Sequence, residues 1–130
     1  MGLRPCWLAL GWLLVAAVCW LSLTTQPPDL GEQDGDKLGH LLAYFSLMAW
    51  WGQLDVRRNL LLGLFLLLGL MLEGLQGLIP MRQPSGLDML ANATGAGLGW
   101  LITRAWPDWL PRLERRWRAC CVRGRSRARP

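Results

Sequence analysis

Four long apolar blocks, separated by short polar joints, dominate the chain. They cover residues 6–25, 38–54, 59–79 and 87–103. No charged residue lies between Pro5 and Pro28, and Glu73 alone is charged within the third block. A helix needs about 20 apolar residues, within a range of roughly 17–25, to cross the hydrocarbon core of a bilayer. Because the apolar runs are continuous and do not alternate, strands are not expected. The pattern predicts an all-α membrane protein, a bundle of four transmembrane helices.

The same pattern divides the chain into two parts. Residues 1–103 form the predicted four-helix transmembrane domain, and residues 104–130 form a basic tail. Arg4 before the first block is also compatible with a signal peptide. No small-x-small cleavage site follows Leu23, so we expect the first block to remain as a true span.

Composition supports the membrane class. Apolar residues make up 52% of the 130 residues and charged residues 18%, with a formal net charge of +5. The charges gather in the joints and the tail, and eight of the fourteen basic residues lie in the last nineteen positions. A soluble domain would spread its charges over its helix faces. This distribution therefore excludes a soluble globular enzyme and a disordered chain.

The arginines also predict an orientation. Arg57 and Arg58 follow the second block, and the tail is Arg-rich, whereas the joint 26–37 is mainly acidic. Cytoplasmic loops of membrane proteins carry an excess of Lys and Arg. We therefore expect both termini in the cytoplasm and two loops outside.

The tail carries an apolar stripe between its arginines. Its members are Trp106, Trp109, Leu110, Leu113, Trp117, Cys120 and Cys121. The spacing predicts an amphipathic helix over Leu113–Cys121, lying on the cytoplasmic leaflet. Pro107 and Pro111 are expected to limit helix to the part after about residue 111. A nucleic-acid tail would not need the tryptophans, so no nucleic-acid partner is expected.

Polar residues of the later blocks gather at the predicted outer ends. One helical face carries Asp36, His40 and Tyr44 at the start of the second block. Glu73 and Gln76 precede Pro80 at the end of the third block, Arg82 lies in the next loop, and Asp88 and Asn92 open the fourth block. Ionisable groups at membrane depth usually face the bundle interior or a watery cavity. The sequence thus predicts an outward-facing polar pocket that holds a ligand.

A purely structural interpretation stays open. Asp36 and Asp88 suit helix starts, where the helix dipole favours carboxylates. Glu73 and Arg82 could form a fixed ion pair. The pocket is favoured because so many groups lie on one side.

Small residues recur at four-residue spacing in the fourth block, at Ala91, Gly95 and Gly99. Such spacing lets membrane helices approach closely. Packing within the bundle is the first interpretation, and a homodimer through these three residues is the second. The four cysteines are not placed to close a loop across the outer face, so no structural disulfide is expected.

These motifs together resemble the VanZ-like membrane family. The resemblance rests on Asp36-Lys37-x-x-His40-x-x-x-Tyr44-Phe45, Glu73-x-x-Gln76, Arg82, and Asp88-x-x-x-Asn92-x-x-Gly95-x-x-x-Gly99, within residues 34–100. It implies a bacterial inner-membrane protein of the cell envelope. The named member of the family is associated with low-level resistance to the glycopeptide teicoplanin, so antibiotic resistance is carried over only as a family label.

Three classes of function remain. The first is a non-enzymatic envelope protein that binds a lipid headgroup, a cell-wall precursor or a glycopeptide, with Arg82 contacting phosphate or carboxylate and His40, Tyr44, Gln76 and Asn92 supplying hydrogen bonds. The second is a small membrane-embedded acid–base or metal-dependent enzyme acting on an envelope lipid. The third is transport, which four short spans suit poorly. With a single His and no metal-ligand motif, no metal or cofactor is expected.

Overall fold

The computed structural model describes residues 4–24, 35–54, 57–80, 85–107 and 109–117. Four long helices cover most of this range: α1 (Arg4–Leu23), α2 (Gly35–Leu54), α3 (Arg58–Gln76) and α4 (Gly86–Ala105). A short helix follows at 109–117, and no strand occurs within the described ranges. The all-α prediction is confirmed, and each apolar block contains one helix, with ends displaced by a few residues.

Local chemistry accounts for the displaced ends near the predicted pocket. Ser85 is extended, with φ −123° and ψ 121°, and its carbonyl accepts the N–H of Asp88 in the first turn of α4. The helix of α3 ends at Gln76, four residues before Pro80, after which turns of the chain satisfy the carbonyls of Leu75 and Gln76. Pro80 could not continue the helix, because it lacks a backbone N–H.

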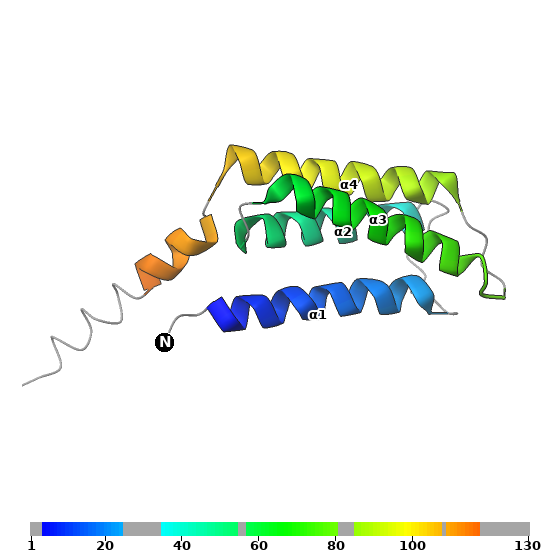
Figure 1. The fold of residues 1–130 in the computed structure, drawn as a ribbon, viewed down its shortest axis with the longest axis horizontal. Helices are drawn as coiled ribbons and strands as arrows, with labels where there is room; N and C mark the ends of the chain where they lie inside the picture. Colours follow the sequence, from blue (N-terminus) through cyan, green and yellow to red (C-terminus); the bar gives the residue numbers. More distant parts are fainter. Residues whose placement is uncertain (1–3, 25–34, 55–56, 81–84, 108, 118–130) are drawn as a thin grey trace, which may run out of the picture.

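The helices run lengthwise side by side, with the start of one near the end of the next (Figure 1). The most extensive contact joins α2 and α4. Glycines make this contact close. A Cβ at Gly95 would overlap the Leu41 carbonyl, and a Cβ at Gly99 would lie 2.7 Å from the Phe45 carbonyl oxygen. The small residues of α4 therefore pack inside the bundle, and a homodimer through them would need Gly95 and Gly99 to leave α2.

The core lies around the middle of α2. Tyr44, Leu47 and Met48 are almost completely buried there, together with Ala96 of α4. Val18 of α1 and Phe65 of α3 complete the cluster. The first helix is further fixed through tryptophans, because the Trp7 and Trp50 rings meet edge to face and Trp50 Nε1 donates to the Trp7 carbonyl at 3.1 Å. α2 thus forms the centre against which the other helices pack.

Large apolar side chains cover the outside of the bundle. Examples from each helix are Trp20, Leu42, Leu70 and Leu101, each more than half exposed. Two of the described helices, α1 and α3, are long and apolar enough to cross a membrane. In α2 and α4 the polar positions lower the apolar content, and these are the helices with most mutual contact.

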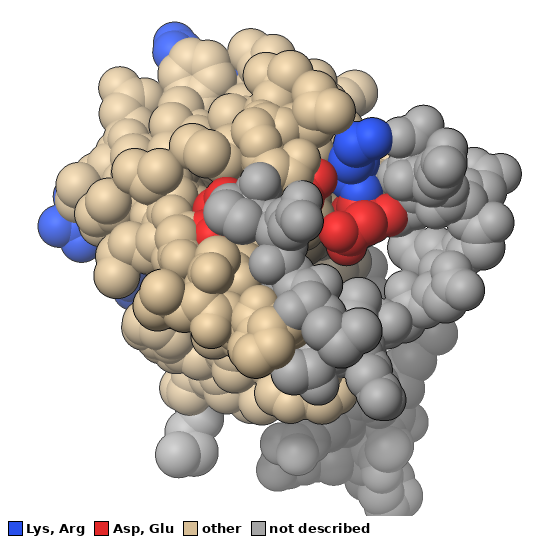
Figure 2. Space-filling view, turned by 90° about the vertical axis from the view of Figure 1, so that its right-hand side faces the viewer, with Lys and Arg blue, Asp and Glu red and all other residues tan. Residues whose placement is uncertain are grey.

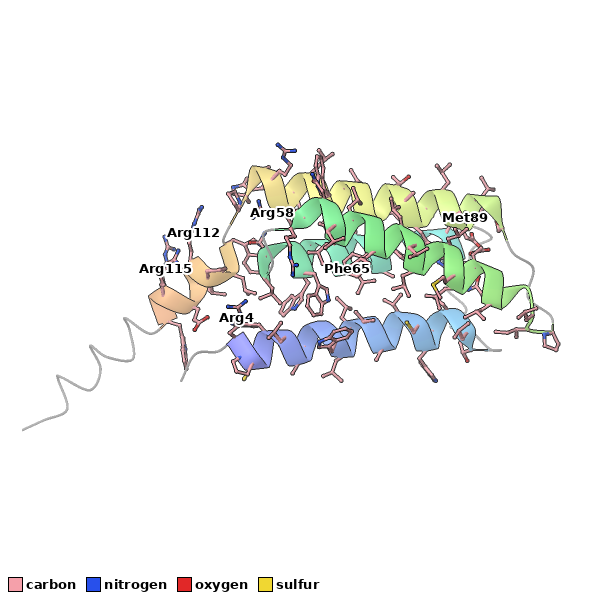
Figure 3. The ribbon with its side chains drawn as sticks, in the orientation of Figure 1. Arg4, Arg58, Phe65, Met89, Arg112 and Arg115 are labelled. Atoms are coloured by element: carbon pink, nitrogen blue, oxygen red, sulfur yellow. The ribbon has the colours of Figure 1, made fainter. Side chains whose placement is uncertain are left out.

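The two ends of the bundle differ in charge. We call the end with the start of α1, the end of α4 and helix 109–117 the basic end; it holds Arg4, Arg58, Arg112 and Arg115 (Figure 3). The opposite end, at the starts of α2 and α4 and the end of α3, holds Asp36, Glu73 and Asp88, and we call it the acidic end. The start of α1 and the helix 109–117 therefore lie at the same end of the bundle, as expected when four consecutive helices are antiparallel.

The short helix after α4 starts earlier than the sequence indicated. It spans 109–117 and includes Pro111. The prediction that the helix begins only after about residue 111 is therefore wrong. Pro111 is the third residue of this helix. Prolines are tolerated in a first turn, because the N–H groups there have no intrahelical partner. Leu110 is only 2% exposed and anchors the helix, whereas Leu113 and Trp117 are about half exposed. Cys120 and Cys121 lie outside the described residues.

Candidate functional site

The structure brings the predicted pocket residues together at the acidic end. Acidic side chains gather in the view toward this end, beside a basic one (Figure 2). Asp36 is 60% exposed at its side chain. The other six described members are at most 9% exposed: His40, Tyr44, Glu73, Gln76, Asp88 and Asn92. Arg82, the eighth predicted member, lies outside the described residues.

His40 and Asn92 form the central contact between α2 and α4. The distance from His40 Nδ1 to Asn92 Oδ1 is 3.0 Å, and the contact is buried. A carboxamide oxygen only accepts hydrogen bonds, so Nδ1 is the ring nitrogen that carries the proton. The second nitrogen of a neutral ring, Nε2, then presents a lone pair on the opposite edge of the ring.

Two carboxylates lie near the His40 ring. His40 Nε2 lies 3.9 Å from Asp36 Oδ1, one helical turn earlier on α2. Asp88 joins them from the first turn of α4, and one ligand atom from each of the three residues lies within 4.8 Å of the other two. The i, i+4 spacing thus places Asp36 and His40 on one face, as predicted, and α4 brings the third group.

Glu73 is the most deeply placed carboxylate of the described part. It is 4% exposed, and its Oε1 accepts a hydrogen bond from the backbone N–H of Ser85, just before α4. Its Oε2 is buried and has no hydrogen-bond partner among the residues described. The sequence suggested Arg82, which lies outside the described residues, as the partner of Glu73. The structure supplies a backbone N–H for one oxygen, which was not anticipated.

Tyr44 and Asn92 meet beside Gly69 of α3. A Cβ at Gly69 would lie 3.3 Å from both the Tyr44 hydroxyl and Asn92 Nδ2, so the missing side chain leaves room for these polar groups. The Tyr44 hydroxyl is buried without a hydrogen-bond partner within the described ranges. Together with Glu73 Oε2, it is a polar atom whose hydrogen-bonding capacity a ligand could use.

Gln76 connects α3 to α1. Its Nε2 donates to the Ser22 carbonyl of α1 at 2.7 Å, in a buried position. This bond joins the ends of α1 and α3 at the acidic end. Ser22 was not singled out from the sequence, because a backbone carbonyl at a helix end gives no residue-type signal.

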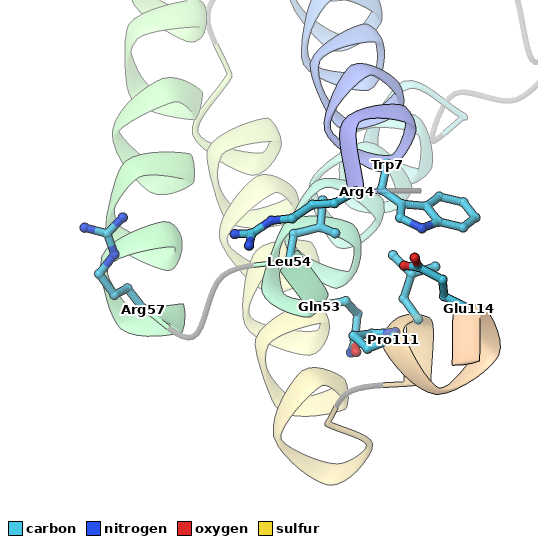
Figure 4. Close-up of a pocket in the computed structure, with 8 residues that line it drawn as sticks. Arg4, Trp7, Gln53, Leu54, Arg57, Pro111 and Glu114 are labelled. Atoms are coloured by element: carbon cyan, nitrogen blue, oxygen red, sulfur yellow. The ribbon is translucent and has the colours of Figure 1, made fainter. Parts of the chain in front are cut away.

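A second polar region, at the basic end, was missed. Gln53 Nε2 donates to the Trp106 carbonyl, and Gln53 Oε1 accepts the Trp109 N–H, both at 3.1 Å. Gln53 borders a pocket of about 550 Å³ that lies between α1, α2 and helix 109–117 (Figure 4). Its lining includes Arg4, Trp7, Arg57, Leu110 and Glu114. Gln53 lies near the end of the second apolar block, where a single glutamine forms no motif, so the sequence did not predict these contacts.

Comparison with known proteins leaves the family open. No family model, curated protein or solved structure matches this chain. The VanZ-like resemblance therefore stays a prediction from the motifs. The acidic end combines carboxylates, an oriented imidazole and buried hydrogen-bonding groups.

Proposed function

We propose that this chain is a four-span, VanZ-like protein of a bacterial inner membrane. In this proposal both termini are cytoplasmic, and the acidic end forms an outward-facing pocket for part of a cell-envelope molecule. The basic end supports the orientation, since Arg58, Arg104, Arg112 and Arg115 lie there. The exposed apolar side chains on α2 and α4 support the crossing of these two helices as well.

The observation that carries the proposal is a pair of buried polar atoms at the acidic end, one in a carboxylate and one in a phenol, that have no hydrogen-bond partner among the described residues. Burying a polar group without a hydrogen bond costs about 1–3 kcal/mol by mutational measures. Glu73 Oε2 and the Tyr44 hydroxyl are both in this state among the described residues. Glu73 is already held through Oε1, which leaves Oε2 for another partner. A ligand that hydrogen-bonds both groups would remove this cost.

The ligand classes follow from these donors and acceptors. A lipid headgroup, a cell-wall precursor and a glycopeptide all present hydroxyl and amide groups, which can bond to a carboxylate oxygen and a phenol. Arg82, which follows α3 in the sequence, would add a bidentate contact to a phosphate or carboxylate. Antibiotic resistance would follow only if the bound molecule were the glycopeptide or its target.

Binding to the full chain in lipid nanodiscs tests the proposal. Native mass spectrometry would compare a bacterial phospholipid, a lipid-linked cell-wall precursor and teicoplanin. Tyr44→Phe removes only the hydroxyl, and Glu73→Gln keeps the shape of the side chain. Thr94→Val, on the exposed face of α4, serves as the control.

We expect one ligand class to bind the natural protein and the control. Tyr44→Phe and Glu73→Gln should weaken this binding by about tenfold each, since a hydrogen bond contributes roughly 0.5–1.5 kcal/mol and more with a charged group. Equal binding by all four proteins, or no binding of any class, would overturn the proposed pocket.

A further inference from the structure

We infer that the basic end holds a second binding site, which takes the phosphate headgroup of an anionic phospholipid from the surrounding leaflet. The site is a cavity of about 420 Å³ between the start of α3 and the end of α4. Its lining consists of Arg57, Arg58, Asn59, Leu60, Trp100 and Arg104. These described lining residues include three guanidinium groups and no carboxylate. Arginine stays charged in proteins, so the repulsion between the three groups is relieved by an anion and not by loss of a proton.

Two of these arginines are held in place by neutral groups. The Arg104 guanidinium lies over the Trp100 ring, 4.8 Å from its centroid. Arg58 Nε donates to the Gly52 carbonyl at 3.1 Å, which leaves the two terminal nitrogens of this guanidinium for another acceptor. Within the part of the chain that the structure describes, neither Arg58 nor Arg104 forms an ion pair with a carboxylate. Both side chains are therefore oriented, and their charges are not neutralised there.

The neutral polar residues of the cavity add hydrogen-bond donors. Trp100 Nε1 donates to Asn59 Oδ1 at 3.0 Å, and this bond ties α4 to α3 beside the arginines. The Asn59 Nδ2 group then remains as a donor for a ligand. The first turn of α3 contains no acidic residue, so the helix dipole adds to the positive potential. Donors and positive charges together suit the oxygens of a phosphate.

The surface next to the cavity favours a lipid over a free phosphate. Leu60, which lines the cavity, is 53% exposed. On α3, Gly63 lies one helical turn beyond Asn59, and on α4, Gly97 lies one helical turn from Trp100. A Cβ at either glycine would meet no atom within 4 Å. An acyl chain can therefore lie along this apolar surface while its phosphate stays among the arginines.

This inference rests on the proposed function for the placement of α3 and α4 in a bilayer, and it does not involve the pocket at the acidic end. Basic pockets between membrane helices on the cytoplasmic side bind the headgroups of anionic lipids. The two sites lie at opposite ends of the bundle. Each can therefore be disabled by substitution while the other is measured.

Native mass spectrometry of the full chain in detergent measures the binding. Three probes are added separately: phosphatidylglycerol, phosphatidylcholine with the same acyl chains, and inorganic phosphate. Arg58→Gln and Arg104→Gln each remove one guanidinium from the cavity. Arg115→Gln removes the same charge from an exposed position of helix 109–117 and serves as the matched control. Tyr44→Phe alters only the acidic end.

We expect one phosphatidylglycerol to bind with similar affinity to the natural protein, Arg115→Gln and Tyr44→Phe. Arg58→Gln and Arg104→Gln should each weaken this binding at least about fivefold, the effect of one arginine beside an anionic lipid surface. Arg104→Lys keeps the charge and loses the planar group over Trp100, so it should recover only part of the affinity. Phosphatidylcholine should bind more weakly, because its choline cation would meet the arginines.

Three results would overturn the lipid site. The first is equal phosphatidylglycerol binding by Arg58→Gln, Arg104→Gln and the control. The second is equal affinity for the two lipids, or stronger binding of inorganic phosphate than of phosphatidylglycerol, which would indicate a free anion. The third is phosphatidylglycerol binding that weakens only in Tyr44→Phe, which would place the lipid at the acidic end.

The outcomes also separate this site from the proposed function. If the arginine variants lose the lipid while no envelope ligand responds to Tyr44→Phe, the lipid site stands and the proposed pocket fails. If an envelope ligand responds to Tyr44→Phe and the arginine variants bind phosphatidylglycerol like the control, the pocket stands and the lipid site fails.

Discussion

The His40 ring and the Asn92 carboxamide, 52 residues apart in the chain, form the buried hydrogen bond that ties α2 to α4 at the acidic end. This bond fixes the distance between the helices and the tautomer of the ring at once. His40 lies one helical turn after Asp36 on α2, and Asn92 lies one helical turn after Asp88 on α4. The packing of the bundle and the chemistry of the pocket therefore depend on the same pair of residues.

Replacing Asn92 by alanine should destabilise the bundle. The change leaves the His40 Nδ1–H buried without its acceptor, which costs about 1–3 kcal/mol. Thr94→Ala is the matched control, because the Thr94 hydroxyl bonds only the Leu90 carbonyl of its own helix and is exposed. Thermal unfolding in detergent should show a lower midpoint for Asn92→Ala than for Thr94→Ala. Equal midpoints would show that the His40–Asn92 bond does not hold the helices.

Two glycines of α4 should respond in opposite directions to alanine. A Cβ at Gly95 would overlap the Leu41 carbonyl, so Gly95→Ala forces α2 and α4 apart and should cost at least about 1–3 kcal/mol. Gly97 has open space around the same position, and alanine there should stabilise the helix by about 0.5–1 kcal/mol. Unfolding measurements on the two variants test the packing directly. A tolerated Gly95→Ala would contradict the close contact.

Gln53 should control the position of helix 109–117. Gln53→Leu removes both the donor to the Trp106 carbonyl and the acceptor for the Trp109 N–H. Hydrogen exchange within 109–117 should become faster, because the start of the helix loses both of its hydrogen bonds to α2. Gln53→Glu retains the acceptor and loses the donor, so its exchange rate should fall between those of the natural protein and Gln53→Leu. Unchanged exchange in Gln53→Leu would mean that other contacts hold the helix.

The helices and the gathering of polar residues at one end could be predicted from the sequence. Uninterrupted apolar runs leave few alternatives to helices, and the spacing of Asp36, His40 and Tyr44 fixes a shared face. The short joints make neighbouring helices antiparallel, which brings Glu73 and Asp88 to the same end. These steps depend only on local periodicity and chain length.

The specific partners could not be predicted. Periodicity does not fix the rotation of α4 about its axis, so it could not show that Asn92 meets His40 while Asp88 meets Asp36. Backbone partners, such as the Ser85 N–H that bonds Glu73, have no residue-type signature. The role of Gln53 could not be predicted either, because its two hydrogen-bond partners lie more than 50 residues away in the sequence.

The side of the membrane that the acidic end faces is the most direct test of the proposed function. In a cysteine-free chain expressed in intact bacterial cells, Gly86→Cys places a thiol in open space at the acidic end. Arg112→Cys places one on the exposed part of helix 109–117. A membrane-impermeant maleimide should label Gly86→Cys in intact cells and Arg112→Cys only after permeabilisation. Labelling of Arg112→Cys in intact cells, with Gly86→Cys protected until permeabilisation, would contradict an outward-facing pocket.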